Sequence, residues 1–426
     1  MIIHVVQKDE NINSIAEMYG KDTERLIQEN GIINPENLAL GQTIVIVDAK
    51  ELYQVEEGDT LASIAEKNGI SVLQLLRNNP YIINREFIYP GESLVIQFQD
   101  EKVMKIATNG YVFPYVELKT LEKNLLFLTY LSIFSYFATA DGNIDDIDDI
   151  NIIKLAKMYG VAPVMVISFT EEVEDVRGEI VHNILTDEGA KKRFIDNIQT
   201  IVQQKDYEAI NLSFTYIRTE DITYFGNLVV EISEKFHREG VEVFVTFTPR
   251  TFEIEPETLS KEVEYSLISK SVDEIYILSY DWASEASMMA VTTPFYFVRS
   301  VMDLFTSRIP PEKIMMGATT IGYMWELPYF EGISKTNSIN YNNAILLASE
   351  TNSTIYYNEE NVSSYFYFSN PNLHLVYFRD ARGFVTYNQM MPNFGLHGIA
   401  LWNVMYDITQ IFFILNTQYE IENITV

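Results

Sequence analysis

Residues that could do chemistry gather at the ends of three predicted β-strands. They are Asn211, Ser213 and Thr215 in the first segment, Tyr280 and Asp281 in the second, and Trp402 in the third. Side chains alternate along a strand, so Asn211, Ser213 and Thr215 point to the same side. Amide and hydroxyl groups can hold a ligand by hydrogen bonds. A Thr hydroxyl, however, has no proton to release near neutral pH, whereas burial can bring a carboxyl group to a working pKa.

Eight β-rich segments that alternate with helical patterns must position these residues. They cover residues 103–108, 130–136, 161–168, 209–216, 241–248, 274–280, 314–319 and 397–402. This alternation predicts an α/β fold, a (β/α)8 TIM barrel, with helices over 186–204, 221–239 and 405–416. The stretch of about 321–393 is predicted to be a small α+β insertion on the rim. The carboxyl ends of barrel strands form one mouth, so we expect the three segments to meet there.

An internal repeat occupies the first hundred residues. Runs recur in the same order: Ser14-Ile15-Ala16 as Ser63-Ile64-Ala65, Asn30 as Asn79, and Gly41-Gln42 as Gly91-Glu92. Each copy predicts a strand, two helices and a strand, and either Asp59 or Thr60 caps the first helix of the second copy. The chain is therefore expected to have three parts, at residues 1–48, 51–98 and 102–426.

The composition excludes several classes of protein. Sixty acidic and 30 basic side chains give a net charge of -30, which repels nucleic-acid phosphates and an anionic bilayer. No apolar run reaches about 18 residues, and Met1 leads into a strand pattern, so we expect neither a membrane span nor a signal peptide. The absence of Cys excludes disulfides and thiol chemistry, and the five scattered His predict no zinc site. We expect no cofactor.

The repeat resembles the LysM module, most clearly in the second copy. LysM modules bind N-acetylglucosamine polymers, peptidoglycan or chitin, in a shallow groove between two loops. In the second copy the resemblance implies these groove residues: Gly58, Asp59, Thr60, Leu61, Asn84, Phe87 and Ile88. In the first copy it implies residues 9–12 and 33–37. Alternatively, these loops only hold the fold together and the modules serve as spacers.

Further runs lie along most of the remaining chain: Asn109-Gly110-Tyr111, Leu131-Ser132-Ile133-Phe134, Gly322-Tyr323-Met324-Trp325 and Phe378-Arg379-Asp380. With the barrel segments, they resemble glycoside hydrolase family 18, and within it the LysM-bearing N-acetylglucosaminidases that degrade spore cortex peptidoglycan. The resemblance implies that Tyr280 contacts the acetamido group of the substrate and that Trp402 forms the floor of a sugar subsite. Asp281 is a further candidate for binding sugar.

The chain departs from the family on the predicted fourth strand, where the family carries Asp-x-x-Asp-x-Asp-x-Glu. In the family, the Glu protonates the glycosidic oxygen, and the Asp two positions before it orients the acetamido group that attacks the anomeric carbon. These positions hold Thr215 and Ser213 here, so both carboxyl groups are missing. The other carboxylates weighed as replacements are Glu208, expected to face away from the mouth, and Glu220, Asp221 and Asp281.

We therefore predict a catalytically inactive relative of the family, a self-associating structural protein of the bacterial spore envelope. It would be made in the mother-cell cytoplasm and deposited on the spore as part of the coat, the exosporium or a parasporal body. The expected partners are peptidoglycan or another N-acetylglucosamine-containing glycan, further copies of the chain, and spore-envelope proteins. Two alternatives stay open: an active peptidoglycan N-acetylglucosaminidase with a displaced general acid, and a lectin-like module that captures glycan.

Overall fold

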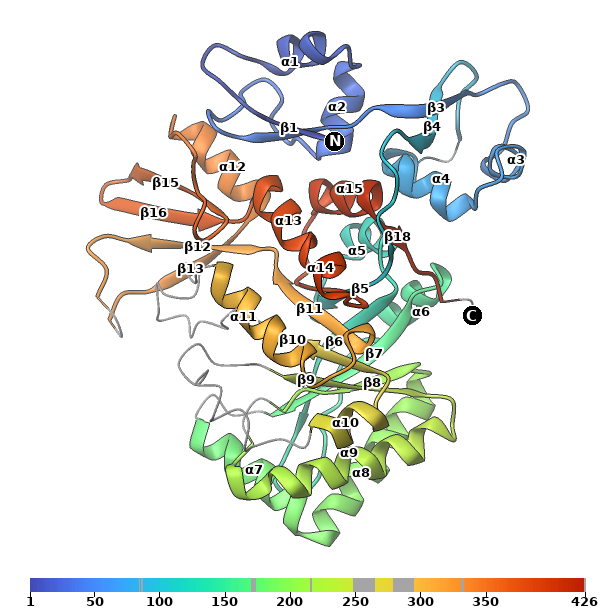
Figure 1. Ribbon diagram of the computed structural model, residues 1–426, viewed down its shortest axis with the longest axis vertical. Helices are drawn as coiled ribbons and strands as arrows, with labels where there is room; N and C mark the ends of the chain where they lie inside the picture. The colour runs from blue at the N-terminus through green and yellow to red at the C-terminus, as the bar shows by residue number, and fades with distance from the viewer. Residues whose placement is uncertain are drawn as a thin grey trace.

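Parallel strands close into a barrel in the computed structural model (Figure 1). The structure describes residues 1–83, 85, 87–169, 174–214, 217–247, 265–278, 295–330 and 333–424. The eight barrel strands in this part of the chain are β5 Lys105–Val112, β6 Tyr130–Ala138, β7 Ala162–Phe169, β8 Ala209–Leu212, β9 Glu242–Phe247, β10 Glu274–Ile277, β11 Ile314–Thr319 and β17 Gly398–Trp402. Each pairs with the next in parallel, and β17 pairs with β5 to close the ring. The predicted (β/α)8 fold is confirmed.

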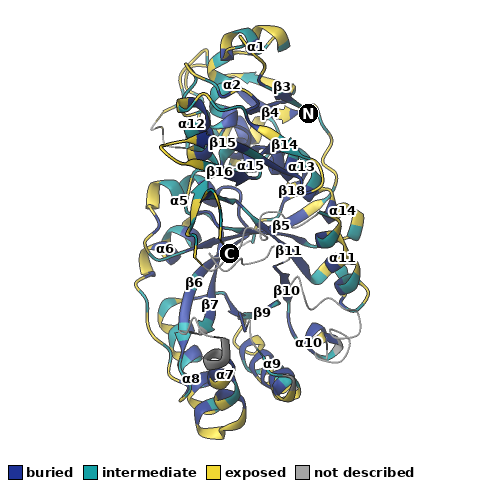
Figure 2. Cartoon of the chain, turned by 90° about the vertical axis from the view of Figure 1, so that its left-hand side faces the viewer, coloured by how far each residue is buried: buried dark blue, intermediate teal, exposed yellow. Residues whose placement is uncertain are grey.

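Alternate side chains of the strands fill the inside of the barrel, and the others pack under a ring of helices. The inner layer includes Ala107, Tyr111, Tyr130, Val164, Phe244, Tyr276, Met315 and Ala400. The helices are α5 Leu118–Leu125, α6 Ile150–Met158, α8 Glu188–Lys205, α9 Ile222–His237, α10 Tyr265–Ser271, α11 Phe295–Thr306, α13 Ala381–Asn388, α14 Met390–Phe394 and α15 Thr409–Gln418. Figure 2 shows the strands largely buried and the outer helix faces exposed. This is the burial pattern of a packed barrel core.

Two helix boundaries differ from the sequence prediction. A separate helix, α7 Glu174–Thr186, comes before α8, because the Asp187 carboxylate accepts a hydrogen bond from the Ala190 amide and starts a new helix. The last helix begins at Thr409 rather than at residue 405. Asp407 accepts a hydrogen bond from the Thr409 amide there, which fixes the preceding segment as a turn.

The α+β insertion leaves the barrel directly after β11, at the carboxyl ends of the strands. Its elements are β12 Ile321–Glu326, β13 Thr336–Asn340, α12 Tyr341–Glu350, β14 Tyr356–Asn358, β15 Ser363–Ser369 and β16 Leu373–Phe378. The strands pair antiparallel in the order β13-β12-β16-β15-β14, and α12 packs on one face of the sheet. The domain limits stay predictions. The element order favours an end of the insertion near Phe378, because α13 and α14 then rejoin the helix ring.

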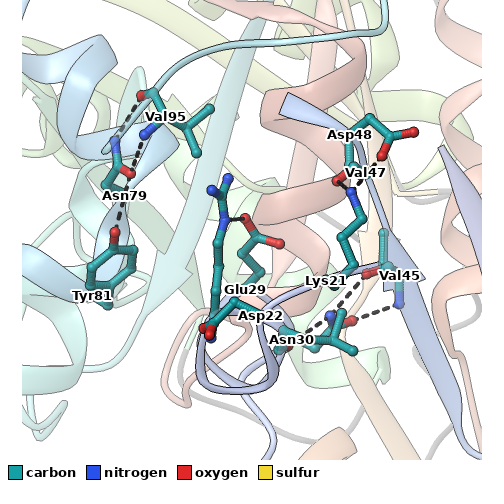
Figure 3. Close-up of polar contacts among 12 residues, drawn as sticks. Lys21, Asp22, Glu29, Asn30, Val45, Val47, Asp48, Asn79, Tyr81 and Val95 are labelled. Carbon is teal, nitrogen blue, oxygen red and sulfur yellow. Dashed lines mark hydrogen bonds and ion pairs between the residues drawn. The ribbon is translucent and has the colours of Figure 1, made fainter. Parts of the chain in front are cut away.

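The two N-terminal copies have the same βααβ order. The first contains β1 Ile2–Val5, α1 Ile12–Tyr19, α2 Thr23–Asn30 and β2 Thr43–Ile46; the second contains β3 Ala49–Gln54, α3 Leu61–Lys67, α4 Val72–Asn78, the short 3-10 turn η1 Pro80–Ile82 and β4 Ser93–Phe98. The side chain of Asn30 forms hydrogen bonds with both the carbonyl and the amide of Val45. Its repeat counterpart Asn79 does the same with Val95, and all four bonds measure 2.7 to 2.9 Å (Figure 3). Among the described residues, no helix is both long and apolar enough to span a bilayer.

Candidate active site at the barrel mouth

The end of β8 holds two of the three motif positions predicted from the sequence. Asn211 and Ser213 are both buried, and the Thr246 hydroxyl on β9 donates a 2.8 Å hydrogen bond to the Asn211 side-chain oxygen. Thr215 lies outside the described residues. Because these three positions carry an amide and two hydroxyls, β8 offers no carboxyl group at the mouth.

A layer of polar side chains lies inside the barrel among the aromatic rings. The Ser132 hydroxyl donates to the Asn109 side-chain oxygen at 2.8 Å. Within the described part of the chain, the buried polar atoms of this layer that have no hydrogen-bond partner include Nδ2 of Asn109, Nδ2 of Asn211 and the hydroxyls of Tyr111 and Tyr276. Burial raises the pKa of the Tyr276 phenol well above its usual value, so this group stays a donor. Since an unpaired buried donor costs about 1 to 3 kcal/mol, this layer favours polar groups in a ligand.

Trp402 forms the centre of an aromatic floor at the end of β17. Its ring centroid lies 5.3 Å from that of Tyr111, 5.7 Å from that of Phe113 and 5.2 Å from that of Phe134. The indole is half-buried, so part of it faces the mouth. The sequence prediction named Trp402 but missed Phe113 and Phe134. Strand alternation could have indicated Phe134, which lies two positions after the inward-facing Ser132.

The structure shows the surroundings of some of the other predicted barrel residues, whereas the remaining ones lie outside the described part of the chain. Tyr280 and Asp281 lie outside the described residues. Asp221 is buried, and its Oδ1 lies 2.8 Å from Nδ1 of His182, so it faces α7 and not the mouth. Glu208 forms an ion pair of 3.1 Å with Lys157 on α6. Glu220 is exposed directly after the β8 segment, and of the described replacement candidates it alone is exposed to solvent.

A second group of titratable side chains lies at the amino ends of the strands, away from the mouth. Nδ1 of His397 lies 2.6 Å from the Glu274 carboxylate, and its Nε2 lies 3.3 Å from Glu422. Burial raises the pKa of nearby Glu242 to about 7, and the negative charge of Asp273 adds to this effect. In the described ranges, no three His, Asp or Glu side chains gather as metal ligands.

The predicted groove of the second module is largely open. Gly58, Thr60 and Phe87 are exposed, Leu61 and Ile88 are half-buried, and Asn84 lies outside the described residues. The Asp59 carboxylate accepts hydrogen bonds from the Glu56 amide at 2.8 Å and the Tyr53 hydroxyl at 2.9 Å, and these bonds lower its pKa. Thr60, not Asp59, caps α3. Asp59 therefore holds the loop in place, while its neighbours remain accessible.

Comparison with known proteins places this geometry in a family. A family model described as glycosyl hydrolases family 18 matches residues 175–407, which is more than half of the chain. The chain belongs to glycosyl hydrolase family 18. A LysM domain model matches residues 4–47 and 53–97, the two N-terminal copies.

Several relatives match this family 18 chain over its whole length. The cortical fragment-lytic enzyme of Bacillus subtilis (strain 168) is 27% identical, and the match covers 99% of each chain. The cortical fragment-lytic enzyme of Bacillus anthracis is 24% identical, over 100% of this chain and 98% of the relative. The crystal structure of the spore cortex-lytic enzyme SleL of Bacillus megaterium superposes with a TM-score of 0.80 at 24% identity, covering 99% and 98% of the two chains.

These comparisons correct one prediction from the sequence. The prediction of a catalytically inactive, self-associating structural protein of the spore envelope is wrong, because the relatives that match the chain from end to end are named lytic enzymes. The prediction relied on the chemistry of one strand, with Ser213 and Thr215 in place of carboxylates. The ends of the other barrel strands also open on the mouth, and a carboxyl group from any of them can approach the same ligand.

Proposed function

We propose that this family 18 chain is a peptidoglycan-cleaving N-acetylglucosaminidase that acts on spore cortex. One observation carries the proposal: the relatives named cortical fragment-lytic enzymes share both LysM copies and the barrel, over 99% of each chain in the Bacillus subtilis case. This similarity favours the spore as the place of action. Synthesis in the mother cell, followed by deposition at the spore, is the corresponding proposal for location.

The barrel mouth supports binding of an amino-sugar polymer. Sugar rings have apolar faces and polar edges, and the mouth offers the exposed part of the Trp402 ring above the polar layer of Asn109 and Asn211. Phe113 and Phe134 pack edge-on against the indole and hold it in one orientation. A sugar stacked on Trp402 can place its acetamido group toward the polar layer.

Cleavage of the glycosidic bond requires a proton donor outside β8. The leaving oxygen must receive a proton as the bond breaks, and a positioned acid contributes about 10² to 10⁴-fold to the rate. Ser213 and Thr215 cannot supply this proton. We propose that it comes from Asp281 or Glu220, because Asp221 is held by His182 and Glu208 by Lys157.

The experiment incubates the full chain with purified cortex fragments and measures released reducing ends. We expect release by the unsubstituted chain and loss of at least about 100-fold in Asp281→Asn or in Glu220→Gln. Glu234→Gln is the matched control, because Glu234 is exposed on α9 and, among the described residues, forms its ion pair with Arg238, at 3.7 Å. If the unsubstituted chain binds the fragments but releases no reducing ends, the proposal is wrong.

A further inference from the structure

A cavity of about 560 Å³ lies between the second LysM copy and the base of the barrel. The copy contributes the loop between α3 and α4, part of α4 and the end of β4, and the barrel contributes the end of α15 and the short strand β18 Glu420–Ile421. Figure 1 shows α4 and β4 beside β18. The described groove residues 58–61, 87 and 88 do not line this cavity, so it is distinct from the predicted sugar groove. Its volume is in the range of small-ligand sites.

Two cations line this cavity, and their described partners are all neutral. Nζ of Lys102 donates to the main-chain oxygen of Asn416 at 2.7 Å and to that of Tyr419 at 2.9 Å. The Arg77 guanidinium on α4 is buried, and its described hydrogen bonds go to carbonyl oxygens of the barrel. Two positive charges therefore border the cavity without a described carboxylate partner, which favours an anionic group in a ligand.

Carboxylates border the same cavity and remain separate from the two cations. Glu51, Glu101 and Glu420 line it and are exposed, and among the described residues none of the three forms an ion pair. The fourth acidic residue of the lining, Asp100, is half-buried and is paired with the amino group of Met1. Charges of both signs thus border one cavity without neutralising each other. This arrangement suits a ligand that carries both a carboxylate and an amino group.

The uncharged part of the lining fits a peptide better than a sugar. Four side-chain amides line the cavity, those of Asn68, Gln74, Gln97 and Asn423, and an amide can both donate and accept hydrogen bonds, as a peptide backbone requires. Sugar rings stack on exposed aromatic side chains. The one aromatic residue of the described lining is Phe98, which is only 5% exposed. The cavity therefore offers hydrogen bonds and charge, but no ring surface for a sugar.

We propose that this cavity binds the peptide stem of peptidoglycan, with the terminal carboxylate of the stem at Lys102 and in the positive field of Arg77. An amino group of the same stem would lie against Glu51 or Glu101. The choice of peptidoglycan as the source of the peptide rests on the proposed function. Because β18 pairs with the start of β5, the cavity lies at the amino ends of the barrel strands. A bound stem is therefore attached to a part of the polymer outside the mouth.

The experiment titrates the full chain with the stem peptide L-Ala-γ-D-Glu-L-Lys-D-Ala by isothermal titration calorimetry. At pH 7 we expect the C-terminal amide of this peptide to bind about tenfold more weakly than the free acid, and Lys102→Gln to weaken binding of the free acid by about the same factor. Lys67→Gln is the matched control, because Lys67 is an exposed lysine of the same copy that does not line the cavity. We expect this control to bind like the unsubstituted chain.

A second arm repeats the titration at pH 9.5. The Lys102 side chain is exposed in part, but desolvation of its ammonium group and the charge of Arg77 lower its pKa to about 8, against the opposite effect of Glu420. We therefore expect binding by the unsubstituted chain to weaken above about pH 8. Lys102→Arg should bind at both pH values, because a guanidinium group stays charged.

Three results would overturn the proposal: no binding of the free acid at pH 7, equal binding of the acid and the amide, or undiminished binding by Lys102→Gln. Equal binding of all-L tetra-alanine would overturn the assignment to the stem. The comparison of acid with amide uses the unsubstituted chain, so it does not depend on the folding of a variant. Release of reducing ends from glycan strands stripped of their peptides tests the barrel separately. A failure of the proposed hydrolysis is thereby distinguished from a failure of peptide binding.

Discussion

The Arg77 guanidinium donates a hydrogen bond from Nη1 to the main-chain oxygen of Ile421 at 2.9 Å. Its Nε donates to the Leu126 carbonyl oxygen and its Nη2 to the Asn423 side chain. Arg77 is buried, and burial lowers its pKa to about 10, so it remains charged at neutral pH. One side chain of the second LysM copy thus satisfies three acceptors of the barrel.

Arg77→Ala is expected to lower the free energy of unfolding by about 3 kcal/mol, because it leaves buried carbonyl oxygens without donors. Arg85→Ala is the matched control, since Arg85 lies in the same copy, is about one-third exposed, and has as its described partners the Glu92 carboxylate and the Tyr81 ring. Urea denaturation followed by tryptophan fluorescence measures both. Equal losses in the two variants would contradict the role assigned to Arg77.

Gly41 and Gly91 occupy equivalent positions in the two LysM copies, and they test the contact between the first copy and the insertion. Replacement by Ala strains both positions equally, because both have a φ of 88°, but a Cβ at Gly41 would lie 2.1 Å from the Ile355 carbonyl oxygen. We expect Gly41→Ala to cost at least about 2 kcal/mol more than Gly91→Ala in thermal unfolding. A similar cost for both would show that the contact with the insertion contributes nothing to stability.

His397 predicts a pH dependence of stability. Burial alone would lower its pKa, but the hydrogen bond with Glu274 and the charges of Glu274 and Glu422 outweigh burial and raise the pKa to about 9. A raised folded-state pKa stabilises the fold fully below about pH 6.5, and this stabilisation is lost as the pH rises through about 9. His397→Gln should therefore cost up to about 3 kcal/mol at pH 6 and little at pH 10.

Unfolding titrations from pH 5 to 10 measure this difference. His237→Gln is the control, because His237 pairs with Asp273 on the protein surface. A cost of His397→Gln that did not change with pH would show that its contribution comes from packing rather than from charge.

Restoring the family's carboxylates tests how far the mouth is still built for catalysis. We expect the double variant Ser213→Asp, Thr215→Glu to raise the release of reducing ends by 10-fold or more, because a positioned acid contributes about 10² to 10⁴-fold. Ser213→Ala, Thr215→Ala controls for the change in packing. No increase would show that the sugar on Trp402 is not placed within reach of β8.

The fold could be predicted closely because strand and helix signals are local. The strand predicted over 314–319 has the same bounds in the structure. Thr60, which caps α3, is one of the two residues that the sequence offered for this role, the other being Asp59. The helix α7 was missed, since Gly178 interrupts its apolar pattern. A helix boundary set by a single side chain, as at Asp187, gives a weaker sequence signal than a run of apolar residues along a strand.

The candidate site could be predicted only in part. Alternation along β8 correctly indicated that Asn211 and Ser213 share the inside of the barrel. The packing of Phe113 and Phe134 on Trp402 depends on closure between β5, β6 and β17, and no local pattern records it. The sequence also could not show that Ala39 is buried while Tyr89 is exposed, because the insertion that covers Ala39 lies about 300 residues further along the chain.

The contact of Arg77 with Ile421 fixes where the second LysM copy sits on the barrel. Ile421 pairs with Ile106 at the start of β5, so the second copy is mounted at the amino ends of the strands, whereas the mouth opens at their carboxyl ends. Figure 1 accordingly shows α3 and β4 on the side away from the insertion. If the chain has the proposed function, a polymer bound by the second copy would be held at one end of the barrel and cleaved at the other. Anchoring and cleavage would then act on different stretches of glycan.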